Sequence, residues 1–185
     1  LRVADMVGQE GIEKKHLIPY TYPSDEEMKN VGVTGLFLGH YLPWDGLTNA
    51  IIAQANGFTT YQKTVEGSMV SYENLDNHHT GIHDYFKFLK FGFGRATDIA
   101  CLHVRRGRLS REDALNVVKN NDGKFPWSYI NKPLEQILQP LEISLSEFQE
   151  ICDEFTNKRI FVRDNEGKLM KDKNNNLTKL NYDNL

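Results

Sequence analysis

The chain has 185 residues, of which 39% are hydrophobic and 25% are charged, so it is long enough for one compact domain with one core. Its 22 basic and 25 acidic residues leave a net charge of -3, which gives no global electrostatic reason to bind nucleic acid. Two cysteines provide neither a disulfide framework nor a four-thiolate metal site, and no apolar run approaches the ~20 residues of a membrane-spanning helix. We therefore expect a soluble, cytoplasmic, globular protein without a membrane span.

The first segment, residues 1–57, has the pattern of an α/β sheet, and its start without an initiator methionine indicates a piece of a longer protein. A short apolar run over residues 33–41 predicts a strand that is buried on both faces. Ser24 and Glu27 form a capping box for a helix before this strand, and Asp45 is a suitable N-cap for a helix after it. The order helix, strand, helix is typical of an α/β sheet.

Residues 58–158 have helical patterns and no further run of strand length. Helices are predicted over residues 81–91, 95–106, 111–120, 133–138 and 145–156. Ser110 and Ser144 are the expected N-caps of the third and the fifth of these. The last segment, residues 159–185, reads as a small hairpin around 164–167 followed by a polar tail. The predicted fold class is therefore an α/β fragment that is mostly α-helical.

Basic residues are concentrated in one part of the chain. Between His78 and Arg111 there are seven lysines and arginines against two aspartates. His83, Lys87 and Lys90 recur at helical spacing and form one polar stripe beside an apolar one. Such a stripe is often only the solvated face of a core helix. Charges that are set among apolar residues, as in the next predicted helix, are usually paired or bind a ligand.

Two glycines, Gly92 and Gly94, separate these two predicted helices. They can adopt left-handed conformations and allow backbone N–H groups to approach an anion at the start of the second helix. The commoner interpretation of this spacing is a helix C-cap followed by a tight turn. The neighbouring cations favour a phosphate here.

The same segment contains residues that are suited to bind a metal ion. His79 and His83 at i, i+4 lack a third zinc ligand of fixed spacing. Magnesium held by Glu73, Asp76 or Asp84 together with substrate phosphates is the better expectation. No serine or cysteine has the sequence context of a nucleophile. Cys101 is expected to lie on a helix and to pack in the hydrophobic core.

Several long peptides carry a family resemblance. The segments ENLDN, TGIHDYFKFLKFGFGRATD and DGKFPW, in this order and spacing, closely resemble the C-terminal part of the bacterial N-acetyl sugar amidotransferase family, the WbpG-type and PseA-like enzymes. The resemblance spans about residues 22–158. The segment GHYLPWDGLT looks like the GH-x-x-x-x-D-x-x-T signature that follows a late strand in pyrophosphatase-loop enzymes, to which this family belongs.

The resemblance implies both a fold and a reaction. The fold would be the last strands of a pyrophosphatase-loop, adenine nucleotide α-hydrolase-like sheet, followed by a helical region that completes the active site. The reaction would convert a sugar acetamido group to acetamidino in the synthesis of lipopolysaccharide O-antigen or nonulosonic acid. ATP, with Mg²⁺, would activate the amide oxygen and release pyrophosphate, and ammonia would then displace AMP.

The same resemblance implies partner subunits, and it implies that this chain lacks part of the active site. Ammonia would come from a HisH-like glutaminase subunit, with a HisF-like subunit to channel it. The SGGxDS loop and the N-terminal cysteine pairs of the family are absent from this sequence. The chain by itself is therefore expected to be inactive.

The residues expected to act fall into two groups. The expected catalytic residues, which would contact phosphate or a sugar carboxylate or orient such contacts, are Lys87, Lys90, Arg95, Asp84 and Asp98. The expected substrate- or nucleotide-binding residues are Gly39, His40, Asp45, Thr48, Glu66, Glu73, Asn74, Asp76, His83, Gly92, Gly94, Arg105 and Arg106.

Three other interpretations stay open at this point. The chain could belong to a different pyrophosphatase-loop ligase that acts on a nucleobase. It could be a non-catalytic module whose basic stripe docks an acidic partner, such as the ammonia-supplying subunit. The charges could also merely solvate a helical face, in which case their replacement would change stability by only about 0.5 kcal/mol.

Overall fold

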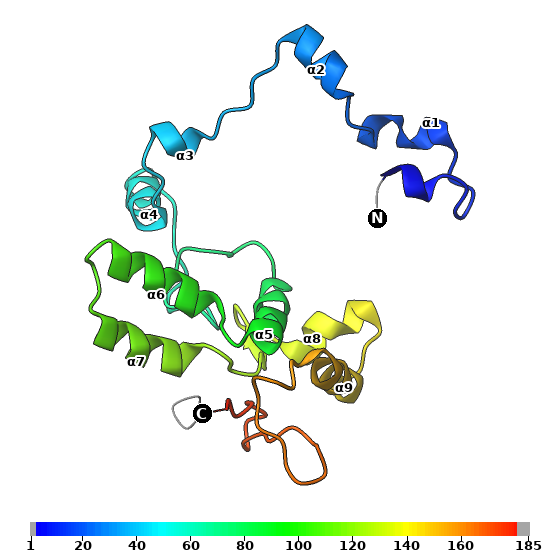
Figure 1. Cartoon of the computed structure of the whole chain (residues 1–185). Coiled ribbons are helices and arrows are strands. Elements are labelled where there is room, and N and C mark those ends of the chain that lie inside the picture. The colour runs from blue at the N-terminus through cyan, green and yellow to red at the C-terminus, as the bar shows by residue number, and fades with distance from the viewer. Residues whose placement is uncertain (1–2, 181–185) are drawn as a thin grey trace. The chain divides into compact units, whose positions relative to one another are not determined.

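A computed structural model describes residues 3–180 of the chain (Figure 1). The chain forms two compact units, Leu1–Gly46 and Leu47–Leu185. The first unit contains the 3₁₀ helices η1 (Val3–Met6) and η2 (Ile18–Tyr20) and the α-helices α1 (Lys14–Leu17), α2 (Asp25–Val31) and α3 (Leu38–Tyr41). Helix α4 (Gly46–Ala55) begins where the units join.

The second unit is mostly helical, as expected. Its elements are α5 (Thr80–Phe91), α6 (Arg95–Arg105), α7 (Arg111–Asn121), β1 (Ser128–Tyr129), β2 (Lys132–Pro133), α8 (Leu134–Leu138), η3 (Gln139–Leu141) and α9 (Leu145–Phe155). In the part of the chain that is described, no helix has the length and apolar composition needed to cross a membrane.

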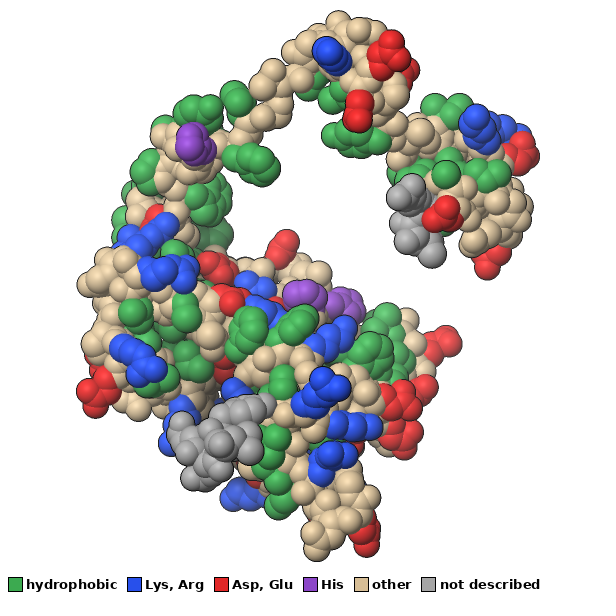
Figure 2. Space-filling view, viewed as in Figure 1, with side chains coloured by type: hydrophobic (Ala, Val, Ile, Leu, Met, Phe, Trp, Pro, Cys, Tyr) green, Lys and Arg blue, Asp and Glu red, His purple; other side chains and the backbone are tan. Residues whose placement is uncertain are grey.

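The strand predicted over residues 33–41 is wrong. Residues 33–37 have no regular secondary structure, and α3 occupies the rest of the run. Phe37 is 89% exposed and Leu36 69% exposed, so the run is not buried, and hydrophobic side chains stand on the surface of this unit (Figure 2). A strand needs a neighbour for its N–H and C=O groups. Within residues 3–180 the only paired strands are β1 and β2, and the other ladder contacts are isolated bridges in the C-terminal segment.

The helices that flank this run form as predicted. The Ser24 side chain accepts a hydrogen bond from the backbone N–H of Glu27, and the Glu27 carboxylate accepts one from the N–H of Ser24 at 2.8 Å. Helix α4 also forms, but its apolar side chains Ile51 and Ile52 are 57% and 58% exposed. The apolar spacing therefore predicted the helix correctly, but not the burial of these two side chains.

The predicted helices of the second unit form within about two residues of their expected ends. Ser110 and Ser144 are N-caps, and their hydroxyls accept hydrogen bonds from the backbone N–H groups of Asp113 and Glu147. Two residues with positive φ, Ile130 at 46° and Asn131 at 61°, connect β1 to β2 in a tight antiparallel hairpin.

The core of the second unit lies where α5, α8 and α9 meet the C-terminal segment. Its buried members are Tyr85, Phe88, Leu89, Phe125, Leu134, Leu138, Phe148, Cys152, Phe161, Leu169 and Leu177. Aromatic rings form much of it, and the ring of Phe125 makes edge contacts with Tyr85 and Phe148 at centroid distances of 5.4 and 6.0 Å. Leu89 is fully buried at its centre.

The C-terminal segment forms the predicted hairpin and then a second turn where only a polar tail was expected. Asp164 and Asp172 each accept hydrogen bonds from two backbone N–H groups at the turns. Phe161, Leu169 and Leu177 recur at eight-residue intervals, and all three enter the core. This short repeat is visible in the sequence and was missed there.

The two cysteines differ sharply in environment. Cys101 is exposed on α6, which corrects its expected place in the core, whereas Cys152 on α9 is buried. Burial raises the pKa of the Cys152 thiol to about 12, so its thiolate is scarce near pH 8.

We expect a thiol reagent such as Ellman's reagent to modify Cys101 rapidly and Cys152 only on unfolding. Absorbance or mass spectrometry measures this, and Cys101→Ser should remove the rapid phase; rapid loss of both thiols would contradict it.

Candidate functional site

A cavity of about 300 Å³ lies in the second unit between α5, the start of α6, the loop before α5 and the segment that follows α7. The loop contributes Glu66 to its wall, and the segment after α7 contributes Asp122 and Trp127. Asp84 of α5 and Arg95 of α6 also belong to its polar lining. These two belong to the expected catalytic residues, so the fold brings part of the predicted site to a cavity.

The start of α6 is occupied by a carboxylate of the chain itself. Asp122 follows α7, and its Oδ2 accepts hydrogen bonds from the Gly94 N–H at 2.8 Å and from the Thr97 hydroxyl at 2.5 Å. Gly94 is extended at φ -119°, so its expected left-handed conformation is wrong, whereas Gly92 has φ 76° and caps α5. The N–H that was expected to meet a phosphate is therefore already used.

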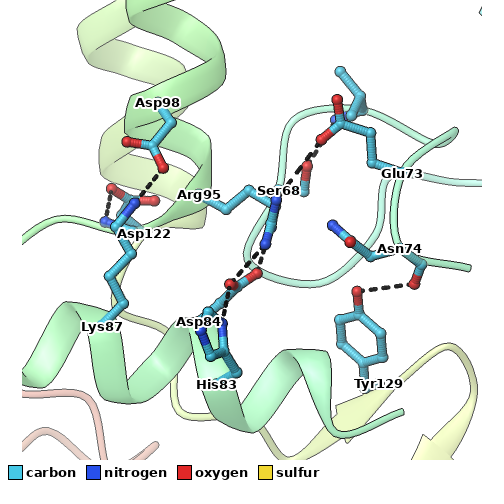
Figure 3. Close-up of polar contacts among 12 residues, drawn as sticks. Ser68, Glu73, Asn74, His83, Asp84, Lys87, Arg95, Asp98, Asp122 and Tyr129 are labelled. Carbon is cyan, nitrogen blue, oxygen red and sulfur yellow. Dashed lines mark hydrogen bonds and ion pairs between the residues drawn. The ribbon is translucent and has the colours of Figure 1, made fainter. Parts of the chain in front are cut away.

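Arg95 is held by carboxylates on two sides. Its Nε and Nη2 donate to Asp84 at 2.5 and 2.9 Å, and its Nη1 lies 3.9 Å from Glu73 Oε2. Asn74, with its amide oxygen turned to the guanidinium, accepts from Nε at 3.2 Å and from Nη1 at 3.1 Å. Figure 3 shows Arg95 reaching from α6 between Asp84 of α5 and the loop that carries Glu73 and Asn74.

The hydrogen bond to Asp84 raises the pKa of Arg95 above its usual value, so the guanidinium stays charged. The Asp84 side chain is 8% exposed and that of Arg95 25% exposed. An ion pair that is shielded from water to this degree fixes two helices and a loop against one another. Arg95 therefore holds the parts of the cavity wall together. Its positive charge is balanced by the neighbouring carboxylates of Asp84 and Glu73.

The predicted lysines are engaged as well. Lys87 forms an ion pair with Asp98, and its Nζ lies 4.7 Å from the centre of the Phe93 ring. Lys90 lies over the Phe155 ring at 5.0 Å. Neither lysine lines the cavity. Arg95 and Lys87 are thus each paired with acidic residues of the expected set, Asp84 and Glu73 for Arg95 and Asp98 for Lys87.

The other expected site residues are spread over the chain. Glu66 Oε2 accepts from the Ile130 N–H at 3.0 Å, and His83 Nδ1 lies 3.1 Å from Asp84 Oδ1. Asp76 and Arg106 are exposed, and Arg105 lines a separate, mainly apolar groove between α6 and α7. Gly39, His40 and Asp45 belong to the first unit, and Thr48 lies on α4. These last four residues were expected to lie together at the end of the predicted strand, and that strand does not form.

Asp84, one of the expected magnesium ligands, is already engaged by other side chains. Both oxygens of Asp84 are taken by Arg95, and one also by His83, which leaves this carboxylate little capacity for a metal. Among residues 3–180, no group of three or more histidine, cysteine, aspartate or glutamate side chains could hold a metal ion. Magnesium held by one or two carboxylates together with substrate phosphates stays a prediction for Glu73 and Asp76.

Sequence reasoning missed most of the cavity wall, including Asp122, Trp127 and Tyr129. The Tyr129 hydroxyl donates to the Asn74 carbonyl oxygen at 3.2 Å, and burial raises the pKa of Tyr129 to about 12, so the hydroxyl keeps its proton. All three lie in or beside the peptide DGKFPW, which carried the family resemblance. That peptide was the signal that could have indicated them.

Comparison with known proteins connects this cavity to a family. Residues 56–175 match the family described as LPS biosynthesis protein WbpG-like, C-terminal domain, which is well over half of the chain. The chain belongs to this family. No curated protein matches the chain in sequence.

The WbpG-like domain contains the whole cavity wall. Its matched range begins after α4 and includes the loop, α5 to α9 and most of the C-terminal repeat. The resemblance found in the sequence over residues 22–158 is thereby confirmed for residues 56–158, and the chain is a lipopolysaccharide biosynthesis protein of the WbpG-like kind.

Proposed function

We propose that this chain is the C-terminal portion of an ATP-dependent N-acetyl sugar amidotransferase, which converts a sugar acetamido group to acetamidino for O-antigen or nonulosonic acid. The observation that carries the proposal is the WbpG-like match over residues 56–175, because this range includes every residue of the cavity wall. In the proposed reaction the amide oxygen is replaced by nitrogen from ammonia. A HisH-like glutaminase would supply that ammonia, with a HisF-like subunit as its channel.

In this proposal, ATP supplies the activation of the amide oxygen. Three groups that were expected to meet phosphate are already paired, because Arg95 and Lys87 contact carboxylates and the N–H of Gly94 donates to Asp122. We therefore assign ATP binding to the part of the protein that would carry the SGGxDS loop. In this proposal, the role of this chain is to hold and orient the sugar.

The test uses the intact protein that contains this chain, with ATP, ammonium chloride and a nucleotide-linked N-acetyl sugar. Free ammonia replaces the glutaminase, so the partner is not needed. We expect mass spectrometry to show that one oxygen of the sugar is replaced by NH, with release of one pyrophosphate per turnover. Omission of ATP or of ammonium should abolish the product.

Two results would contradict the proposal. Release of pyrophosphate with a nucleobase acceptor and no amidine on the sugar would favour a different ligase. Absence of any ATP-dependent product from a folded protein would favour a non-catalytic module.

A further inference from the structure

The charges around the cavity do not suit an anionic ligand. Three carboxylates line it, those of Glu66, Asp84 and Asp122, against the two cations Arg95 and Lys124. Arg95 is already bidentate to Asp84, so its guanidinium has little left to offer a phosphate. The expectation that this cation holds a nucleotide or sugar phosphate is therefore not supported by its surroundings. A ligand that donates hydrogen bonds fits the lining better.

Two carboxylate oxygens have unused acceptor capacity. Asp122 lines the cavity, and its Oδ1 is buried and has no hydrogen-bond partner within residues 3–180. Glu66 Oε1 has only a long contact to the Ser128 hydroxyl at 3.5 Å. Buried polar atoms are nearly always hydrogen-bonded in native proteins, so an orphaned carboxylate oxygen indicates a missing donor. Sugar hydroxyls and an acetamido N–H are donors of this kind.

One side of the cavity is a fixed aromatic surface. The Trp127 indole Nε1 donates to the Asn174 carbonyl oxygen at 2.9 Å, and its ring lies 4.6 Å from that of Phe125. Trp127 is nevertheless 44% exposed. A tryptophan whose ring is held in place and still faces solvent offers a flat apolar surface with little entropy to lose on binding.

We propose that this cavity binds the uncharged ring of the acetamido sugar, with its C–H face on Trp127 and its donors directed to Glu66 and Asp122. The inference rests on the proposed function and names the part of the substrate that the domain holds. The volume of about 300 Å³ lies at the lower end of ligand pockets, as one sugar ring requires. The phosphate-bearing part of the substrate lies outside this cavity, away from the three carboxylates.

The test is a ¹⁵N NMR titration of the full 185-residue chain with N-acetylglucosamine and, separately, with pyrophosphate. The chain has two tryptophans, Trp44 and Trp127, so Trp127→Phe assigns the indole signals. We expect saturable shifts of the Trp127 indole and of the Gly94 and Gly123 amides with the sugar, and none of them with pyrophosphate. Trp127→Ala should weaken sugar binding about tenfold, whereas Trp44→Phe should leave it unchanged.

Glu66→Gln keeps an oxygen for the Ile130 N–H and removes the charge, so it should weaken sugar binding severalfold without loss of the folded spectrum. Saturable shifts of the cavity signals by pyrophosphate, or no saturable shift by the sugar, would overturn the sugar subsite. Those results leave amidine formation by the intact protein as a separate question. Conversely, sugar binding here without amidine formation would overturn the proposed function and support the subsite.

Discussion

Replacement of Asp84 by asparagine is expected to lower the free energy of unfolding by about 3 kcal/mol. The Asp84 carboxylate is 8% exposed and accepts two hydrogen bonds from Arg95. The substitution removes the negative charge and leaves the guanidinium partly buried, with Glu73 at 3.9 Å as the remaining carboxylate. A partly desolvated cation without its partner is much more costly than the pair.

Asp98→Asn is the matched control for this experiment. Asp98 pairs with Lys87 across the same two helices, but its side chain is 51% exposed. An exposed ion pair contributes about 0.2–1 kcal/mol, so the control should unfold close to the parent protein. Urea denaturation monitored by circular dichroism measures both. Equal losses for the two variants would show that Arg95 is solvated and does not fasten the helices to the loop.

The sequence predicted this pair only in part. Arg95 was recognised as a charge among apolar neighbours, which is either paired or ligand-binding, and the carboxylates near it were expected to orient the cations. The choice between these outcomes depends on the angle at which α6 leaves Gly94, because that angle decides which carboxylate Arg95 meets. This angle cannot be predicted from the spacing of residues along one helix.

Local patterns predicted local structure well. The caps at Ser24, Ser110 and Ser144 were each correct, because a cap depends on residues three positions apart. The apolar run before Pro43 failed, because its composition suits a strand, but a strand also requires a paired neighbour. The local sequence pattern does not show whether a distant segment is available to pair with this run.

The cavity residues likewise divide into those that local sequence indicates and those that depend on tertiary contacts. Glu66, Asp84 and Arg95 were expected at a site and line the cavity. Asp122 and Trp127 were missed, because aspartate and tryptophan beside a glycine and a proline read as an ordinary loop. Their importance depends on the return of this loop to the start of α6, which the hydrogen bond of Asp122 to Gly94 fixes.

The second large effect is expected for Gly123→Ala, which should lower the free energy of unfolding by about 3 to 5 kcal/mol. Gly123 has φ 72°, a conformation that alanine adopts only with strain. A Cβ atom placed there would also lie 2.2 Å from Cζ of Phe88. Phe88 is 5% exposed and its ring lies 5.4 Å from that of Phe161, so it has little room to move away.

Gly107→Ala separates the two causes. Gly107 has φ 67° but nothing within 4 Å of its added Cβ, so the variant should lose only about 1 kcal/mol from backbone strain. The difference between the two variants in thermal or urea unfolding then measures the contact with Phe88. Since Phe88 and Gly123 both line the cavity, a partly folded Gly123→Ala protein should also lose the N-acetylglucosamine shifts, whereas Gly107→Ala should keep them. Similar losses of stability in both variants would mean that the core yields around Phe88 and that the cavity wall is not rigid at this point.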